Sequence, residues 1–243
     1  LGKIQCNPVN QFYNQEEGTK NLKIAFDSQK MPRAGVLLAQ AYIDCGQLST
    51  AEKTLRELIK QLETKESKRF HRLSNYDKEM KSNAYLQLGK IYFAEGELQS
   101  SDKTKECYQK CLEILENVKG DASGRIALQK SGILMDEQNP LQNVEKGVEY
   151  LREAAVKGNT IAQYRLGKIL LEEENGDARK EGVNFLKKAA EKKFGYAYVK
   201  LGMIYADKSA YIYDPRTALR YFQQAEECGV RDDMGIIAFK TGM

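Results

Sequence analysis

The chain has 243 residues, of which 42% are apolar and 30% charged, and its formal net charge is +4. This length permits either one large core or an array of repeated modules, and so weak a positive charge does not by itself indicate nucleic-acid binding. No run approaches the ~20 apolar residues that cross a bilayer, so the sequence predicts no membrane span.

A helical hairpin recurs along the chain, and its clearest copy covers residues 162–171 and 182–190. In each copy a small residue is followed five positions later by a second one. The first small residues are Ala34, Ala84, Ala127, Ala162 and Ala197, and the second are Ala39, Gly89, Gly132, Gly167 and Gly202. Because Gly costs a helix interior up to about 1 kcal/mol relative to Ala, its recurrence predicts close contacts between antiparallel helices.

The register predicts several hairpins in chain order. It gives a partial repeat over 1–30, complete hairpins over 31–66, 79–118, 121–158, 159–195 and 196–230, and the start of a further first helix over 231–243. The largest insertion falls in residues 63–77. Residues 1–4 repeat the sequence of 88–91 and 166–169, so we expect the chain to be a fragment of a longer protein.

Two pairs of segments carry a family resemblance. Residues 38–46 and 88–96 align without a gap, and these two units resemble tetratricopeptide repeats. Residues 148–155 and 183–190 resemble the second helix of Sel1-like repeats, which are relatives of that class. Sel1-like proteins are adaptors, so the resemblance implies a non-catalytic scaffold that assembles or regulates a larger complex.

Each hairpin leaves an apolar face uncovered, so we expect neighbouring hairpins to stack. The predicted fold class is an all-α solenoid, a right-handed superhelix of antiparallel helical hairpins whose first helices line a concave groove. Tetratricopeptide domains that clamp a terminal carboxylate use a Lys and Asn pair one turn apart on the first helix. The corresponding residues here are Val36 and Gln40, a departure that does not favour a carboxylate clamp.

First-helix side chains that are not used in packing should face the groove. Lysines at one repeat-equivalent position would offer a basic stripe to an acidic or C-terminal peptide. The alternative is that these lysines belong to solvated helix faces with i,i+4 partners. The candidate partner-binding residues are Gln40, Lys90, Ile133, Tyr164, Lys168, Tyr198 and Met203.

The sequence offers little catalytic chemistry. Its single histidine, His71, lies in the polar insertion, and no Gly-rich phosphate loop occurs, so no catalytic, metal or cofactor site is predicted. Cys107 and Cys111 share a helix face, with Cys111 expected in the core and Cys107 partly buried. The odd number of cysteines, five, favours free thiols and a reducing, cytoplasmic compartment.

Two alternative functions stay open. In the first, the array is the regulatory arm of an enzyme whose catalytic domain lies outside this fragment. It is an RNA-binding protein if the basic residues of 60–81, with Phe70 and Tyr76 among them, bind single strands. Acidic residues dilute the charge of that segment, so a protein partner is favoured over nucleic acid. The sequence does not predict the oligomeric state.

Overall fold

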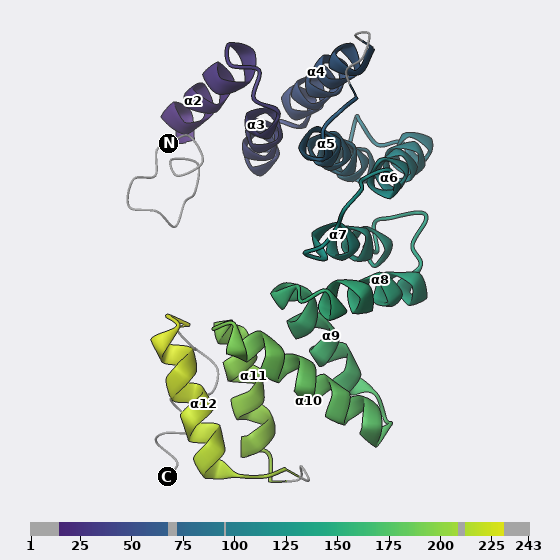
Figure 1. The fold of residues 1–243 in the computed structure, drawn as a ribbon. Helices are drawn as coiled ribbons and strands as arrows, with labels where there is room; N and C mark the ends of the chain where they lie inside the picture. The colour runs from purple at the N-terminus through teal and green to yellow at the C-terminus, as the bar shows by residue number, and fades with distance from the viewer. Residues whose placement is uncertain (1–14, 68–71, 95, 209–211, 231–243) are drawn as a thin grey trace. The chain divides into compact units, whose positions relative to one another are not determined.

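The structure is a computed structural model that describes residues 15–67, 72–94, 96–208 and 212–230. Within these ranges the chain forms eleven helices and no strand (Figure 1). The helices are α2 (Gln15–Asp27), α3 (Pro32–Asp44), α4 (Leu48–Ser67), α5 (Asn75–Phe93), α6 (Ser101–Glu116), α7 (Arg125–Leu134), α8 (Val144–Val156), α9 (Thr160–Glu172), α10 (Gly176–Glu191), α11 (Gly195–Ala206) and α12 (Pro215–Glu227). The predicted all-α class is therefore confirmed.

The described chain divides into two compact units. Unit 1 holds the described residues up to 120 together with 132–144, and unit 2 holds 121–131 together with those from 145 onward. Helix α7 contributes residues to both units. Residues 1–14 of the partial repeat predicted over 1–30 lie outside the described residues, as do His71 and the further first helix predicted over 231–243.

Aromatic side chains of the second helices pack against glycines of the first helices. A Cβ atom added at Gly89 would lie 2.9 Å from the Tyr108 ring, and one at Gly202 would lie 2.5 Å from the Phe222 ring. Both distances are too short for a real methyl group, so only glycine admits the ring at these positions. The predicted contacts of these two glycines are confirmed.

Gly167 also makes the predicted contact, but Gly132 does not. A Cβ at Gly167 would lie 2.9 Å from the carbonyl oxygen of Gly182, whereas one at Gly132 would meet no described atom within 4 Å. Gly132 is exposed, while Ser131 and Ile133 on either side of it are only 2% and 1% exposed. The contact predicted for Gly132 is wrong.

The different orientation of α7 follows from its sequence. Ser131 holds the position that Leu166 holds in α9, where the leucine is fully buried. In α7 the large apolar residues that follow Gly132, Ile133 and Leu134, are 1% and 5% exposed, so they are buried together with Ser131. The buried arc of α7 therefore reaches Ile133 and leaves Gly132 in solvent.

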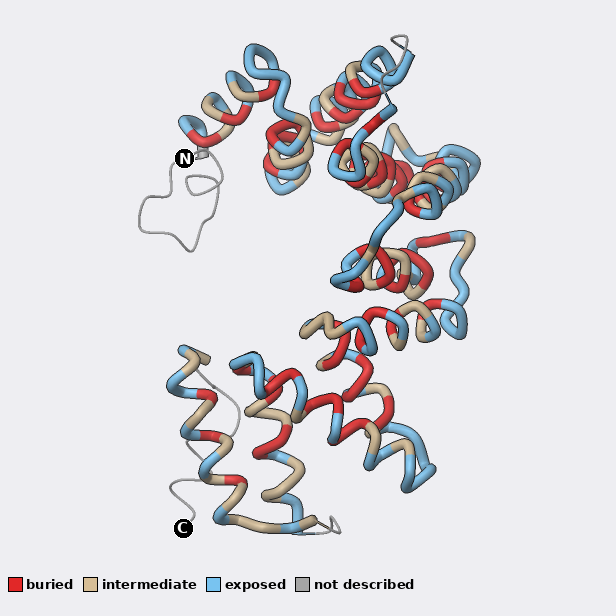
Figure 2. Tube along the Cα trace, in the orientation of Figure 1, coloured by how far each residue is buried: buried red, intermediate tan, exposed pale blue. Residues whose placement is uncertain are grey.

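Neighbouring hairpins in unit 2 share their interior. Figure 2 shows buried residues recurring along one side of each helix. One cluster contains Ala127 of α7, Leu151 of α8, Leu166 of α9 and Phe185 of α10. A single hairpin could not enclose these side chains, so stacking supplies the core, as expected for a repeat array.

Helix α5 begins earlier than the predicted start at residue 79. The Oγ atom of Ser74 accepts a hydrogen bond from the backbone N–H of Asp77 at 3.0 Å and so caps the helix. The Asp77 carboxylate, which is 3% exposed, accepts hydrogen bonds from Ser74 Oγ at 2.8 Å and from Lys65 Nζ at 2.6 Å. These contacts join the end of α4 to the start of α5.

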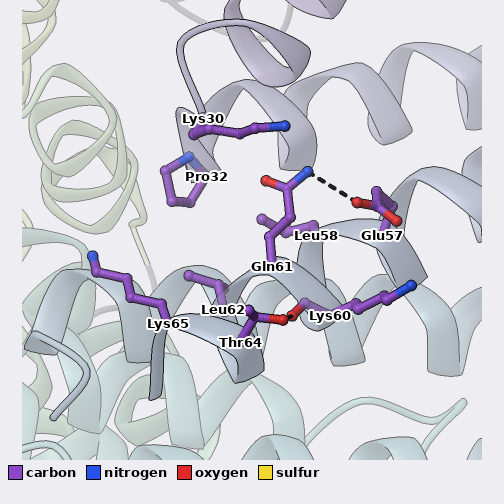
Figure 3. A pocket seen from close by; sticks show the side chains of 9 residues that line it. All are labelled: Lys30, Pro32, Glu57, Leu58, Lys60, Gln61, Leu62, Thr64 and Lys65. Carbon is purple, nitrogen blue, oxygen red and sulfur yellow. Dashed lines mark hydrogen bonds between the residues drawn. The ribbon is translucent and has the colours of Figure 1, made fainter. Parts of the chain in front are cut away.

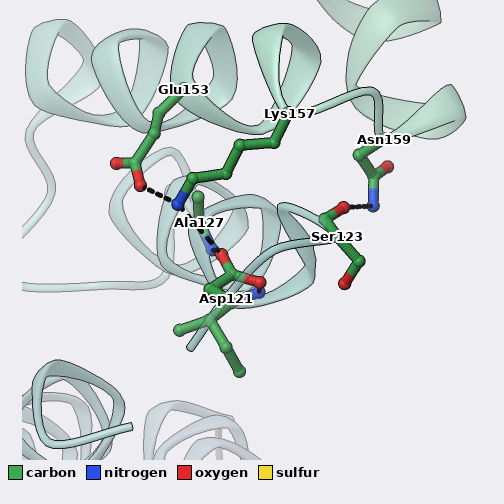
Figure 4. Close-up of polar contacts among 7 residues, drawn as sticks. Asp121, Ser123, Ala127, Glu153, Lys157 and Asn159 are labelled. Carbon is green, nitrogen blue, oxygen red and sulfur yellow. Dashed lines mark hydrogen bonds and ion pairs between the residues drawn. The ribbon is translucent and has the colours of Figure 1, made fainter. Parts of the chain in front are cut away.

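In unit 2, a polar network ties the start of α7 to the turn between α8 and α9 (Figure 4). The carboxylate of Asp121 accepts hydrogen bonds from the backbone N–H groups of Ile126 and Ala127 at 3.1 and 2.9 Å. Lys157 lies 3.8 Å from the same carboxylate. Asn159 caps α9 and donates its amide to the Ser123 carbonyl at 3.4 Å. Side chains thus fix both helix starts.

Candidate partner-binding surface

In unit 1, the candidates Gln40 and Lys90 are exposed but already make polar contacts within the chain. Gln40 donates to Asp44 at 2.8 Å and accepts at 3.2 Å from Gln87 of α5, the helix that also carries Lys90. The Nζ atom of Lys90 lies 3.2 Å from Asp136. A partner must therefore compete with an internal carboxylate for Lys90.

In unit 2, Tyr164 lies within a group of aromatic side chains and beside Lys168. Lys168 is exposed, and its ammonium group lies 5.9 Å from the centre of the Tyr164 ring. That ring packs 5.3 Å from Phe194 and 6.4 Å from Tyr196, measured between ring centres. Tyr164 therefore connects α9 to the start of α11, where Tyr196 is 58% exposed.

Tyr198 holds α11 against α12 and is only partly available to a partner. Its ring lies 6.2 Å from Tyr221, which in turn lies 5.5 Å from Tyr205. Burial raises the pKa of both Tyr198 and Tyr221 above the ordinary tyrosine value. These phenols stay protonated at neutral pH and act as packing groups. Met203, the last candidate on α11, is 38% exposed.

Ile133 must be removed from the candidate surface. Its side chain is 1% exposed and belongs to the core because of the changed orientation of α7. A partner could reach it only if the helix moved.

The structure adds exposed apolar residues that were not predicted. Ile161 is 44% exposed and precedes the small residue of α9, just as Tyr196 precedes the small residue of α11. On each helix, the residues four and seven positions after Ile161 or Tyr196 share the same side of the helix. We call this set of six residues the α9–α11 face. The α9–α11 face consists of Ile161, Arg165, Lys168, Tyr196, Lys200 and Met203. It has three apolar residues, three basic residues and no acidic one. The matching repeat positions were the signal in the sequence that could have found it.

A groove in unit 1 beside α4 is a weaker candidate. It has a volume of about 390 Å³ and lies between α4 and the turn that contains Lys30 and Pro32 (Figure 3). The ammonium groups of Lys60 and Lys65 point in opposite directions in Figure 3. Lys65 is also paired with Asp77. The basic side chains of this groove therefore do not converge on one ligand.

Reactive groups are scarce in the described residues. Cys107 and Cys111 are both buried, so the expectation that Cys107 is only partly buried is corrected. Burial raises the pKa of the Cys107 thiol to about 11 and that of Cys111 to about 12, which makes both thiols poor nucleophiles.

Within the described ranges, no group of three His, Cys, Asp or Glu side chains is placed to hold a metal. No helix there is both long and apolar enough to cross a membrane.

The helix pairs and their shared cores define the chain as an all-α repeat solenoid. No protein-family model and no curated protein sequence match it. Among solved structures it is similar to a Sel1 repeat protein from Oxalobacter formigenes, with 21% identity, 88% of this chain and 80% of that chain covered, and a TM-score of 0.53. It is also similar to a protective antigen of uropathogenic Escherichia coli with an SLR fold, with 17% identity, 94% and 52% covered, and a TM-score of 0.43. The first likeness shows that this chain has the fold of a Sel1 repeat protein.

Proposed function

We propose that the chain is a non-catalytic scaffold or adaptor that holds a partner protein or peptide on the exposed faces of its first helices. The α9–α11 face carries this proposal. Ile161, Tyr196 and Met203 are each between 38% and 58% exposed, and none of them is enclosed by the core. Tyr196 of α11 lies beside Tyr164 of α9, and exposed large apolar side chains on neighbouring first helices support a protein interface. A bound partner would remove them from water.

The charges of the α9–α11 face indicate the chemistry of the partner. Arg165, Lys168 and Lys200 separate the apolar residues, and none of the three forms an ion pair with a described carboxylate. An acidic amphipathic helix or peptide would place apolar side chains on Ile161 and Tyr196 and carboxylates on the cations. Assembly or regulation of a larger complex is the role that such a surface supports.

Charge reversal at Lys168 tests the proposal. The wild-type chain serves as bait, captured proteins are identified by mass spectrometry, and the affinity of the purified partner is measured by calorimetry. We expect Lys168→Glu to weaken binding by about tenfold or more, because it brings two negative charges together at the interface. Lys168→Glu that binds the partner as tightly as wild type would show that the face is assigned wrongly.

Lys188→Glu is the matched control. Lys188 is exposed on α10 and lies 5.3 Å from the centre of the Phe185 ring, so it has the same charge and a similar aromatic neighbour. It lies outside the α9–α11 face, and binding should be unchanged. Reversal at Lys90 is a less direct test, because it also breaks the ion pair with Asp136.

We propose that the protein works in a reducing compartment, as the cytoplasm is. No disulfide joins Cys45, Cys107, Cys111 or Cys228, which are the cysteines in the described ranges. The deep burial of Cys107 and Cys111 in α6 supports a role in packing.

A further inference from the structure

A second basic site lies in unit 1, away from the α9–α11 face. It is a pocket of about 440 Å³ formed by the turn before α5, the first turns of α5 and the end of α6. Its lining residues are Glu66, Arg72, Leu73, Lys78, Lys81, Ile114, Asn117 and Lys119. We call it the α5–α6 pocket. Four of the eight residues are basic, and one is acidic.

The single carboxylate of the pocket is already neutralised. Lys81 Nζ lies 3.2 Å from Glu66 and 3.6 Å from Glu63. Lys78 donates instead to the backbone carbonyl of Asn117 at 2.9 Å, at the C-terminal end of α6, so its acceptor is a carbonyl dipole and not a carboxylate.

Two more cations at the pocket have no acidic partner. Among the described residues, no carboxylate lies within 4.0 Å of Arg72 or Lys119, and both are exposed. With Lys78 they give one hollow three lining cations that have no described carboxylate within 4.0 Å. Such an arrangement stabilises an anion that carries more than one negative charge.

We propose that the α5–α6 pocket binds a compact anion that bears a phosphate group. A phosphate monoester carries close to two negative charges at neutral pH and offers several acceptor oxygens. The guanidinium of Arg72 can bind two of these oxygens at once, and Lys78 and Lys119 can each donate to others. A single carboxylate would leave most of the positive charge of the pocket unmatched.

The described lining residues favour an isolated phosphate group over single-stranded nucleic acid. Proteins that bind single strands stack successive bases on aromatic side chains along a groove. No aromatic residue is among those that line the described pocket. Tyr76 is 46% exposed nearby in the sequence but does not line it. Its apolar residues, Leu73 and Ile114, are aliphatic and offer no aromatic ring on which a base could stack.

Calorimetric titration with inorganic pyrophosphate in chloride buffer tests the pocket. The double variant Arg72→Gln and Lys119→Gln should weaken binding by about tenfold or more, because each lost charge-assisted hydrogen bond lowers affinity severalfold. The control variant Lys53→Gln and Lys105→Gln removes the same charge from exposed positions outside the pocket and should change affinity less than twofold. Circular dichroism checks that all variants keep the wild-type helicity.

Two further ligands distinguish the source of the phosphate. A phosphoserine peptide that competes with pyrophosphate supports a phosphorylated protein, whereas pyrophosphate binding alone supports a small phosphate compound. An oligonucleotide without terminal phosphate that binds more tightly than both would replace the proposal with a nucleic-acid site. The proposal also fails if neither phosphate ligand binds, or if the control variant loses as much affinity as the pocket variant. Lys168→Glu should bind pyrophosphate normally, so this test is independent of the proposed function.

Discussion

Gly167 and Gly132 hold the same position in the repeat but have different surroundings, and this predicts opposite effects of alanine. At Gly167 an added methyl group would lie 2.9 Å from a backbone carbonyl that cannot rotate away, so Gly167→Ala should destabilise the protein by about 1–3 kcal/mol. Gly132→Ala meets open space and should stabilise α7 by up to about 1 kcal/mol. Urea unfolding followed by circular dichroism measures both, and a similar loss in the two variants would contradict the packing described for α7.

The same pair shows how far single residues could be predicted from the sequence. The repeat register correctly identified the contacts at Gly89, Gly167 and Gly202, because a costly residue recurs there. It failed at Gly132, because α7 buries the large apolar side chains of Ile133 and Leu134 and leaves Gly132 exposed. Exposed apolar residues such as Tyr196 were missed since they leave the helical periodicity of the core positions unchanged.

At the scale of the elements, the start of α5 predicts a pH-dependent stability. Burial alone would raise the pKa of Asp77, but the hydrogen bonds from Lys65 and Ser74 outweigh it and hold the pKa below its usual value. A carboxyl group whose pKa is lowered by folding stabilises the protein when the pH is above its ordinary pKa, near 3.9. This stabilisation is lost as the pH falls through the lowered pKa of the folded state.

We therefore expect Asp77→Asn to be less stable than wild type at pH 7, and the difference should shrink as the pH falls from about 5 towards 3. Thermal unfolding across this pH range measures it. Asp102→Asn is the control, because Asp102 lies in the first turn of α6 but is exposed. A stability difference for Asp77→Asn that stays constant with pH would exclude the carboxylate as its cause.

The start of α5 at the Ser74 cap also shows why the helix boundaries could be predicted only in part from the sequence. The repeat spacing placed the insertion at residues 63–77 and the next helix near residue 79, whereas α4 runs to Ser67 and α5 starts at Asn75. Repeat alignment reports only the positions that every hairpin shares. The cap formed by Ser74 and Asp77 is particular to this hairpin, so only its own sequence could have indicated the earlier start.

For the molecule as a whole, packing in helix pairs should confine the effect of a destabilising substitution to the helices near it. The most extensively packed pairs are neighbours in sequence, such as α5 with α6, α9 with α10 and α11 with α12. In such an array each repeat is stabilised mainly by itself and by the repeats beside it. Local opening should therefore cost different free energies in different helices. The handedness of the superhelix stays a prediction from the sequence.

Hydrogen exchange of the two destabilised variants would test this local behaviour. We expect Gly167→Ala to speed amide exchange in α9 and α10 while leaving α3 and α4 unchanged, because the disturbed contact joins only the first pair. Asp77→Asn should speed exchange in α4 and α5 and leave α11 and α12 unchanged, because its partners are Lys65 and Ser74. Each variant serves as the control for the other. Equal acceleration in every helix would mean that the array opens as one cooperative unit, and stability would then not be a sum over neighbouring repeats.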